Sequence, residues 1–195
     1  MGKRQIAALE TRKKLILAAE KLIRERGFEG VSVEDVAREA GVAKGTFYTY
    51  FRRKEEVVDV IAHNRFVIAE KEAGKEETAL GQISAFLTES MKYIFDTGLP
   101  VCRQWLKNVV EPEDEQGKSK LAYDAGVIRK ALDAAVERGE LKKDAPTGAL
   151  ADSIAASYYG IVTVWAITNG KCDPVGLIGD YEKNALKALL GAYQI

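Results

Sequence analysis

Residues 32–51 decide the fold, and they read SVEDVAREAGVAKGTFYTYF. Apolar residues recur at helical spacing on both sides of Gly41, which predicts two short amphipathic helices joined by a tight turn. Ser32 and Asp35 have the spacing of a capping pair, so the first helix is expected to begin at Ser32. The second helix is expected over residues 44–51. This arrangement is the layout of a helix-turn-helix.

The second of these helices is expected to have one apolar face and one hydroxyl-rich face. Phe47 and Phe51 are four positions apart, so both are expected to point inward. The outward positions combine hydroxyl groups with a lysine and a glycine, which suits a DNA major groove better than solubility alone. We predict DNA contacts from Lys44, Gly45, Thr46, Tyr48, Thr49 and Tyr50, and phosphate contacts from Lys44 and Lys54. Packing against neighbouring helices is an alternative that suits one of the two tyrosines.

The charge of the chain is unevenly divided. Residues 1–54 contain 13 Lys/Arg and 7 Asp/Glu, although the whole chain has a net charge of zero. The excess of negative charge therefore lies in residues 55–195. A basic N-terminal part predicts contact with a polyanion, although a solvated basic helix surface would have the same composition.

Nearly the whole chain is expected to be helical, because prolines are few and strand-like alternation is never sustained. Gly27 is expected to end the first helix, and the acidic segment 111–117 is expected to be a loop. Further helices are predicted at about 54–71, 78–97, 101–111, 119–139, 146–169 and 174–193. The predicted fold is all-α, with a helix-turn-helix domain over residues 1–54 and a ligand-binding and dimerisation domain over residues 55–195. The helix at about 54–71 links the two domains.

The sequence from Val33 to Phe51, followed by RRKEEV, closely resembles the DNA-binding signature of the TetR/AcrR family of transcriptional regulators. The resemblance covers about residues 10–60. It implies that the residues predicted above for the second helix face the bases and that Lys54 binds phosphate. It also implies that Ser32 and Val33 bring backbone amides close to a phosphate. Two positions depart from the family pattern. Ala43 replaces a frequent Ser or Thr cap, and Glu34 stands where some members have a base-reading residue.

The resemblance further implies a homodimer, a small-molecule effector and repression as the usual sign of regulation. Aromatic and sulfur side chains are frequent in the C-terminal part and are suited to an apolar cavity, although each is also an ordinary core residue. The predicted effector-binding residues are Phe66, Phe86, Tyr93, Cys102, Trp105, Tyr123 and Tyr159. For the dimer, we expect the last two helices to contribute apolar residues such as Ile154, Tyr158, Trp165, Leu186 and Leu190, shared in part with the core.

Other functions are less well supported. The sequence contains no nucleotide-binding or hydrolase motif and no metal-ligand cluster, so neither an enzyme nor a cofactor or metal is expected. A helical interaction module without DNA binding is the principal alternative, and an activator is another. Cys102 and Cys172 are far apart and fit a reducing cytoplasm. The uncharged residues 153–170 are too polar for a lone membrane helix, so no membrane is expected.

Overall fold

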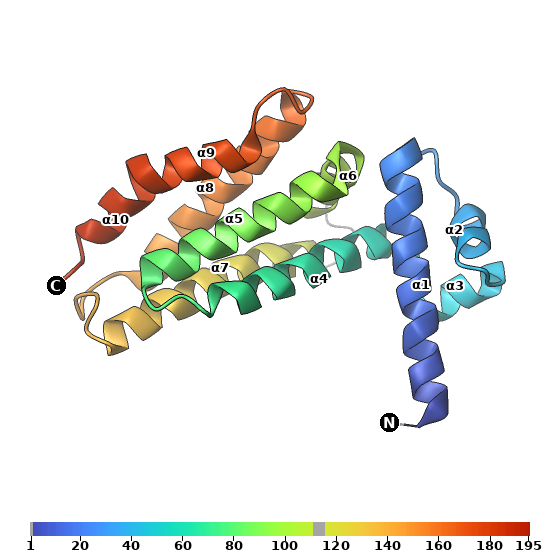
Figure 1. Ribbon diagram of the computed structural model, residues 1–195, viewed down its shortest axis with the longest axis horizontal. Helices are drawn as coiled ribbons and strands as arrows, with labels where there is room; N and C mark the ends of the chain where they lie inside the picture. Colours follow the sequence, from blue (N-terminus) through green and yellow to red (C-terminus); the bar gives the residue numbers. More distant parts are fainter. Residues whose placement is uncertain (1, 111–115) are drawn as a thin grey trace.

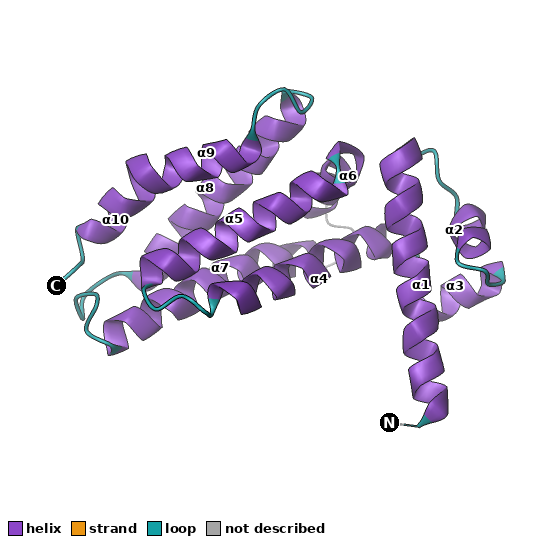
Figure 2. Ribbon diagram, in the orientation of Figure 1, coloured by secondary structure: helices purple, strands orange, loops and turns teal. Residues whose placement is uncertain are grey.

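The computed structural model describes residues 2–110 and 116–195, which fold almost entirely into helices (Figures 1 and 2). Strand-type pairing within these residues is limited to one bridge between Leu141 and Gln194. The all-α prediction is therefore confirmed. In chain order the elements are α1 (Lys3–Arg26), α2 (Val33–Glu39), α3 (Lys44–Tyr50), α4 (Glu55–Ala73), α5 (Ala79–Thr97), α6 (Leu99–Val110), α7 (Gln116–Glu137), α8 (Thr147–Ile167), α9 (Pro174–Tyr181), η1 (Glu182–Leu186) and α10 (Lys187–Gly191).

The helices α1, α2 and α3 form a small N-terminal part at one end of the molecule (Figure 1). One face of α1 is buried at the spacing expected from the sequence, with Leu15, Ala19 and Leu22 almost inaccessible to solvent. The helix ends at Gly27, as predicted, where φ is 76°. This backbone conformation strongly favours glycine, because a β-carbon would be strained there.

The long helix α4 leads from the small part into a larger bundle (Figure 1). It packs along α5 and also contacts α1 and α6. On the other side of the bundle, α7 packs along α8, and α9 lies against both α5 and α8. The linking helix predicted at about 54–71 is observed close to those limits, as α4.

The apolar core is continuous between the two parts of the molecule. Phe47 of α3, Val57 and Val58 of α4, and Leu190 of α10 all belong to one connected cluster of buried side chains. The first turns of α4 are therefore packed into the same core as the helix-turn-helix. The proposed domain boundary after residue 54 stays a prediction.

The last predicted helix, over residues 174–193, is not a regular α-helix. It consists of α9, a π-helical segment over Glu182–Leu186, and α10. A π-turn adds one residue to the hydrogen-bonded ring, and the apolar spacing of so short a segment does not reveal it. Most of the predicted acidic loop, residues 111–115, lies outside the described residues.

The apolar face of α8 was expected to contribute to the dimer, but it is buried inside the single chain. Ile154, Tyr158 and Trp165 are at most 3% exposed within the single chain, as are Leu186 and Leu190. These five residues therefore belong to the core of their own subunit and do not lie at a dimer interface, which is the alternative that the sequence left open for part of the stripe. Among the described helices, α8 is the one long and apolar enough to span a membrane, but its buried stripe is typical of a core helix.

Candidate nucleic-acid interface and effector site

The helix-turn-helix predicted over residues 32–51 is present as α2, a turn and α3. Ser32 caps α2 in both directions: its Oγ accepts from the Asp35 amide at 3.1 Å, and its own amide donates to Asp35 Oδ2 at 3.0 Å. In the turn, Gly41 has a φ of 68°, which favours glycine. The predicted capping pair and the glycine turn are both confirmed.

Phe47 and Phe51 anchor α3 on the small core. Their exposed fractions are 0% and 2%, and their ring centroids are 5.4 Å apart. Val36 and Ala37 of α2 are buried in the same region. Close packing around both rings leaves α3 little freedom to rotate about its axis. The predicted inward orientation of the two phenylalanines is confirmed.

The opposite face of α3 is open to solvent. Tyr48 is 51% exposed and contacts Phe47 only edge-on. Tyr50 is half-buried and packs against the core, and Thr46 is also half-buried. Packing therefore explains one tyrosine of the face but not the other. The exposed positions are Lys44, Gly45, Tyr48 and Thr49.

One carboxylate lies beside this exposed face. Glu34 of α2 forms an ion pair with the ammonium of Lys44 at the start of α3. The hydrogen bond from Lys44 lowers the pKa of Glu34 and raises the pKa of Lys44, so both groups stay charged at neutral pH. Glu34 therefore offsets part of the positive charge that α3 presents.

Lys54 precedes α4 and binds backbone groups of the segment between α1 and α2. Its Nζ donates to the carbonyl oxygens of Phe28 at 2.6 Å and Val31 at 2.7 Å, and it lies 3.8 Å from the centroid of the Phe28 ring. These contacts give Lys54 a structural role that the sequence did not reveal. Its phosphate contact, like the backbone contacts of Ser32 and Val33, stays a prediction.

The helix α3 begins without a side-chain cap. Ala43 occupies the N-cap position in an extended conformation, with φ −70° and ψ 149°. Its carbonyl accepts from the Thr46 amide at 2.9 Å, but no side-chain oxygen is available there for the first amides of the helix. Replacement of the usual Ser or Thr by Ala43 therefore leaves α3 without a side-chain N-cap.

Four of the seven predicted effector-binding residues form a stack of rings inside the bundle. The ring centroid of Phe66 on α4 lies 6.2 Å from that of Phe86 on α5 and 6.0 Å from that of Trp105 on α6. Trp105 in turn lies 5.4 Å from Tyr159 on α8. The stack therefore connects four helices, although the role of each ring in effector binding stays a prediction.

Tyr93 and Cys102 lie beside this stack and line a hollow of about 20 Å³ together with Phe66. A single water molecule fills such a volume, so an organic ligand does not fit without movement of the walls. Burial raises the pKa of the Cys102 thiol to about 12. This cysteine stays protonated and acts as a small apolar residue.

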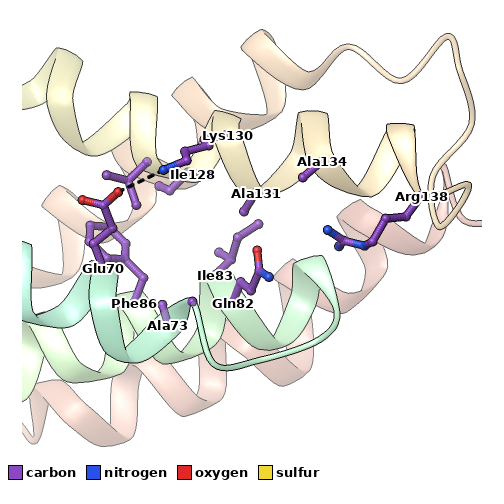
Figure 3. Close-up of a pocket in the computed structure, with 12 residues that line it drawn as sticks. Glu70, Ala73, Gln82, Ile83, Phe86, Ile128, Lys130, Ala131, Ala134 and Arg138 are labelled. Atoms are coloured by element: carbon purple, nitrogen blue, oxygen red, sulfur yellow. Dashed lines mark ion pairs between the residues drawn. The ribbon is translucent and has the colours of Figure 1, made fainter.

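A larger groove of about 280 Å³ lies between α4, α5 and α7 (Figure 3). Its walls are mainly apolar and include Ile83, Phe86 and Ile128. Glu70 lies at one end, with Lys130 Nζ 3.5 Å from its Oε1, and Arg138 lies at the other end (Figure 3). Apolar walls with a few polar groups are typical of small-molecule sites.

Tyr123 is the seventh predicted effector-binding residue, and it lies beside Glu70 at one end of the groove. Its hydroxyl donates to Glu70 Oε2 at 2.7 Å. Desolvation and the neighbouring Glu70 carboxylate raise the pKa of the Tyr123 hydroxyl, which therefore stays a proton donor. His63 is exposed and packs edge-on against the Tyr123 ring at 5.4 Å.

Comparison with known proteins identifies the family. Residues 15–61 match the model of the bacterial regulatory proteins of the tetR family. The chain is also 28% identical over 189 residues to the HTH-type transcriptional regulator TtgR of Pseudomonas putida, an alignment that covers 90% of this chain and 88% of the relative. Residues 15–61 are therefore a TetR-family DNA-binding domain. The protein is a DNA-binding transcriptional regulator, and α2 and α3 are its helix-turn-helix.

Solved structures share the fold of this chain over nearly all of its length. The SmeT–triclosan complex superposes with a TM-score of 0.71 at 19% identity, covering 95% of this chain and 92% of SmeT. FadR from Bacillus subtilis in complex with stearoyl-CoA gives a TM-score of 0.68 at 20% identity, covering 93% and 99%. Identities this low show a shared fold. They agree with the predicted architecture of a helix-turn-helix followed by a helical bundle.

The sequence did not reveal two charged pairs of this protein. The first is the Glu34–Lys44 pair beside the exposed face of α3, and the second is a buried pair between Lys120 and Asp124 of α7. The second pair has the i, i+4 spacing common on exposed helix surfaces, so its spacing carried no signal of burial. Asp124 also accepts a hydrogen bond of 2.8 Å from the hydroxyl of Tyr159, which places the pair next to the ring stack.

Proposed function

We propose that this protein is a homodimeric repressor that leaves its operator when a small molecule binds the C-terminal bundle. The observation that carries the proposal is the exposed face of α3, which Phe47 and Phe51 hold in a fixed orientation from behind. Exposed hydroxyl groups on a firmly packed short helix are suited to reading base edges.

The residues of the helix-turn-helix are assigned different roles in this proposal. Tyr48 and Thr49 read bases, because both are exposed on the outward side of α3, and Gly45 lets the backbone approach the groove closely. Thr46 reads a base with the part of its half-buried side chain that remains accessible. Lys44 and Lys54 contact phosphates, which fixes the register of the helix without reading sequence. Tyr50 is assigned a contact at the edge of the face, since part of its ring packs inward.

The C-terminal bundle is proposed to take the effector. Two neighbours with the same fold were solved with small molecules, stearoyl-CoA and triclosan, which supports a ligand within this bundle. In the present chain the groove between α4, α5 and α7 and the adjoining ring stack are the sites best suited to one. The predicted residues Phe66, Phe86 and Tyr123 line or adjoin these sites.

A chain of polar contacts supports coupling between the ring stack and the DNA-binding part. Gln104, next to Trp105 on α6, donates to Asn108 Oδ1 at 2.8 Å. Asn108 in turn donates to Asp59 Oδ1 on α4 at 2.9 Å. A ligand that displaces Trp105 would therefore shift α6 against the early turns of α4. Effector and operator then weaken each other's binding by the same factor.

The dimer is proposed to form through the outer faces of α8 and α9. Val164 and Ile167 of α8 are 41% and 74% exposed, although both are apolar. Pairing of these faces would place two copies of α3 on one DNA duplex, about 34–36 Å apart. A repressor of this kind acts on the chromosome, so the proposed location is the cytoplasm.

Selection of DNA fragments from a random pool by the full-length protein tests this function. The affinity for the selected sequence would then be measured by fluorescence anisotropy at several salt concentrations. We expect log K to fall linearly with log salt concentration, because Lys44, Lys54 and their neighbours release counterions from phosphates. Failure to bind any DNA at low salt would favour a helical interaction module.

Matched variants separate base reading from folding. Tyr48→Ala should weaken binding to the selected sequence by about tenfold, whereas binding to unrelated DNA should change little. Tyr48→Phe removes only the hydroxyl and shows whether that group makes the contact. Lys143→Ala, at an exposed position between α7 and α8 and away from α3, serves as the control. Equal effects of Tyr48→Ala and Lys143→Ala would contradict the role assigned to α3.

A further inference from the structure

The buried ion pair between Lys120 and Asp124 is an unusual feature of the bundle core. The side chains are 11% and 2% exposed. Moving both charges out of water carries a desolvation cost that their attraction often fails to repay, and an apolar pair of similar volume is often at least as stable. DNA binding does not call for a charged pair at this place, whereas a ligand-binding site accounts for one.

The surroundings of the Lys120 ammonium are those of a receptor for an organic cation. Its Nζ lies 3.4 Å from the ring centroid of Phe66 and 5.5 Å from that of Tyr123. Asp124 supplies the counter-charge, and its second oxygen is fixed by the hydroxyl of Tyr159 at 2.8 Å. Aromatic faces together with a carboxylate are the usual partners of ammonium groups in proteins.

The groove between α4, α5 and α7 reaches the edge of this cation site. Phe86 lines the groove, and its ring is 6.2 Å from the Phe66 ring that lies beneath the ammonium. Glu70 also lines the groove (Figure 3). It binds the hydroxyl of Tyr123, whose ring is the second wall of the cation site. At each of these two places a second side chain, Phe66 or Tyr123, lies between the lining of the groove and the ammonium, so a ligand reaches the site by displacing one of these rings.

We propose that the effector of this regulator is an apolar organic ammonium compound. Its cationic head replaces the ammonium of Lys120 against Asp124 and Phe66, and its apolar part lies in the groove. In the ligand-free protein Lys120 is an internal substitute for the effector. This inference rests on the proposed function, because it assigns a chemical class to the effector of that function.

The charges around the site favour a cation over a neutral or anionic ligand. If the Lys120 ammonium moves away, Asp124 is left in the core without a counter-charge, which is strongly unfavourable. A neutral ligand does not restore that charge. An anion would in addition meet the negative faces of the Phe66 and Tyr123 rings. Only a cation replaces both the ion pair and the contact with the rings.

Three compounds of nearly equal shape test this inference on the full-length protein. Phenyltrimethylammonium is the cation, tert-butylbenzene is its neutral isostere, and benzenesulfonate is the anion. Binding would be followed by tryptophan fluorescence, since Trp105 stacks on Tyr159 beside the site. We expect the cation to bind at least about tenfold more tightly than the other two compounds.

Two variants test the roles of the charged residues. Lys120→Met removes the internal cation and should raise the affinity for phenyltrimethylammonium by about tenfold or more, with little change for tert-butylbenzene. Asp124→Asn should abolish the preference for the cation. Circular dichroism would check that each variant folds. If Asp124→Asn does not fold, Phe66→Leu replaces it and should weaken binding of the cation selectively.

Equal binding of the three compounds to the wild-type protein, or weaker cation binding by Lys120→Met, would overturn the inference. Operator DNA would be titrated in the same samples, so that this result can be separated from a failure of the proposed function. Operator binding without a preference for the cation rejects only the ammonium effector. Absence of DNA binding rejects the regulator itself, whatever the compounds do.

Discussion

In the helix-turn-helix, aromatic rings lie inside and polar groups lie outside: Phe47 is buried beneath α3, and Lys44 and Thr49 face solvent. In the bundle the order is reversed, because Lys120 and Asp124 lie inside and aromatic rings surround them. The first arrangement gives a stable surface for a large polyanion. The second keeps charge in a place where a small ligand can replace it. The two regions therefore differ in where their polar side chains lie: at the surface in the helix-turn-helix and in the core of the bundle.

The largest expected effect tests the apolar support of α3. Phe47→Ala should lower the free energy of unfolding of the N-terminal part by about 3–5 kcal/mol, because it leaves a cavity in a small core. Urea unfolding followed by circular dichroism would measure this loss. Tyr48→Ala, at the neighbouring exposed ring, should change the same quantity by no more than about 0.5 kcal/mol. Similar losses in both variants would mean that the two faces of α3 do not differ as described.

The second test concerns the buried charge of the bundle. Burial lowers the pKa of Lys120 to about 8, below its ordinary value of 10.5. Because the unfolded chain holds this proton more tightly, the free energy of unfolding should rise between pH 8 and pH 10.5, by at most about 3 kcal/mol. Urea unfolding across this range measures the rise.

A matched variant isolates the contribution of the pair. In Lys120→Met/Asp124→Leu both charges are absent, so the increment between pH 8 and pH 10.5 should disappear. Asp124 acts in the opposite direction at acid pH. Its pKa is raised by burial, so its contribution to stability falls as the pH rises above 3.8. An unchanged alkaline profile in the double variant would show that other groups cause the rise.

A smaller effect is expected at the start of α3. Ala43→Ser should stabilise the helix by about 1 kcal/mol, since the extended backbone at this position allows a serine oxygen to accept from the first amides. Chemical unfolding of the N-terminal part would reveal the gain. Ala8→Ser, at a half-buried position inside α1, is the control and should not stabilise. A loss of stability in Ala43→Ser would mean that the cap geometry is not available.

The smallest effect concerns the charge on the DNA-facing side. Glu34→Gln removes the partner of Lys44 and leaves that ammonium available for phosphate. The slope of log K against log salt concentration should become steeper by about 0.9, the value for one more phosphate contact. Anisotropy titrations would measure the slope. An unchanged slope would show that the ion pair with Glu34 does not limit the phosphate contact of Lys44.

The N-terminal site could be predicted from sequence because its pattern is local. The cap at Ser32, the turn at Gly41 and the inward positions of Phe47 and Phe51 depend on residues within a few positions of each other. The helices of the bundle followed from periodicity for the same reason. The π-helical segment at Glu182–Leu186 did not, because one extra residue in a turn leaves hardly any trace in the spacing.

The bundle site could be predicted only as a collection of aromatic residues. Burial of Lys120 depends on Phe66, which is far away in the sequence and belongs to another helix. The apolar stripe of α8 illustrates the same limit, since a face buried in its own subunit and a face buried in a dimer have the same composition. Long-range packing, not local pattern, distinguishes these cases.

The contacts of Lys54 have a consequence for how motion travels through the molecule. Its ammonium holds the carbonyl oxygens of Phe28 and Val31, so the segment between α1 and α2 is fastened to the beginning of α4. A rotation of α4 is therefore expected to move the helix-turn-helix with it as a rigid body, without bending at a hinge between them. When α4 rotates by a few degrees, the exposed side chains of α3 are displaced by a distance that increases with their distance from the axis of rotation.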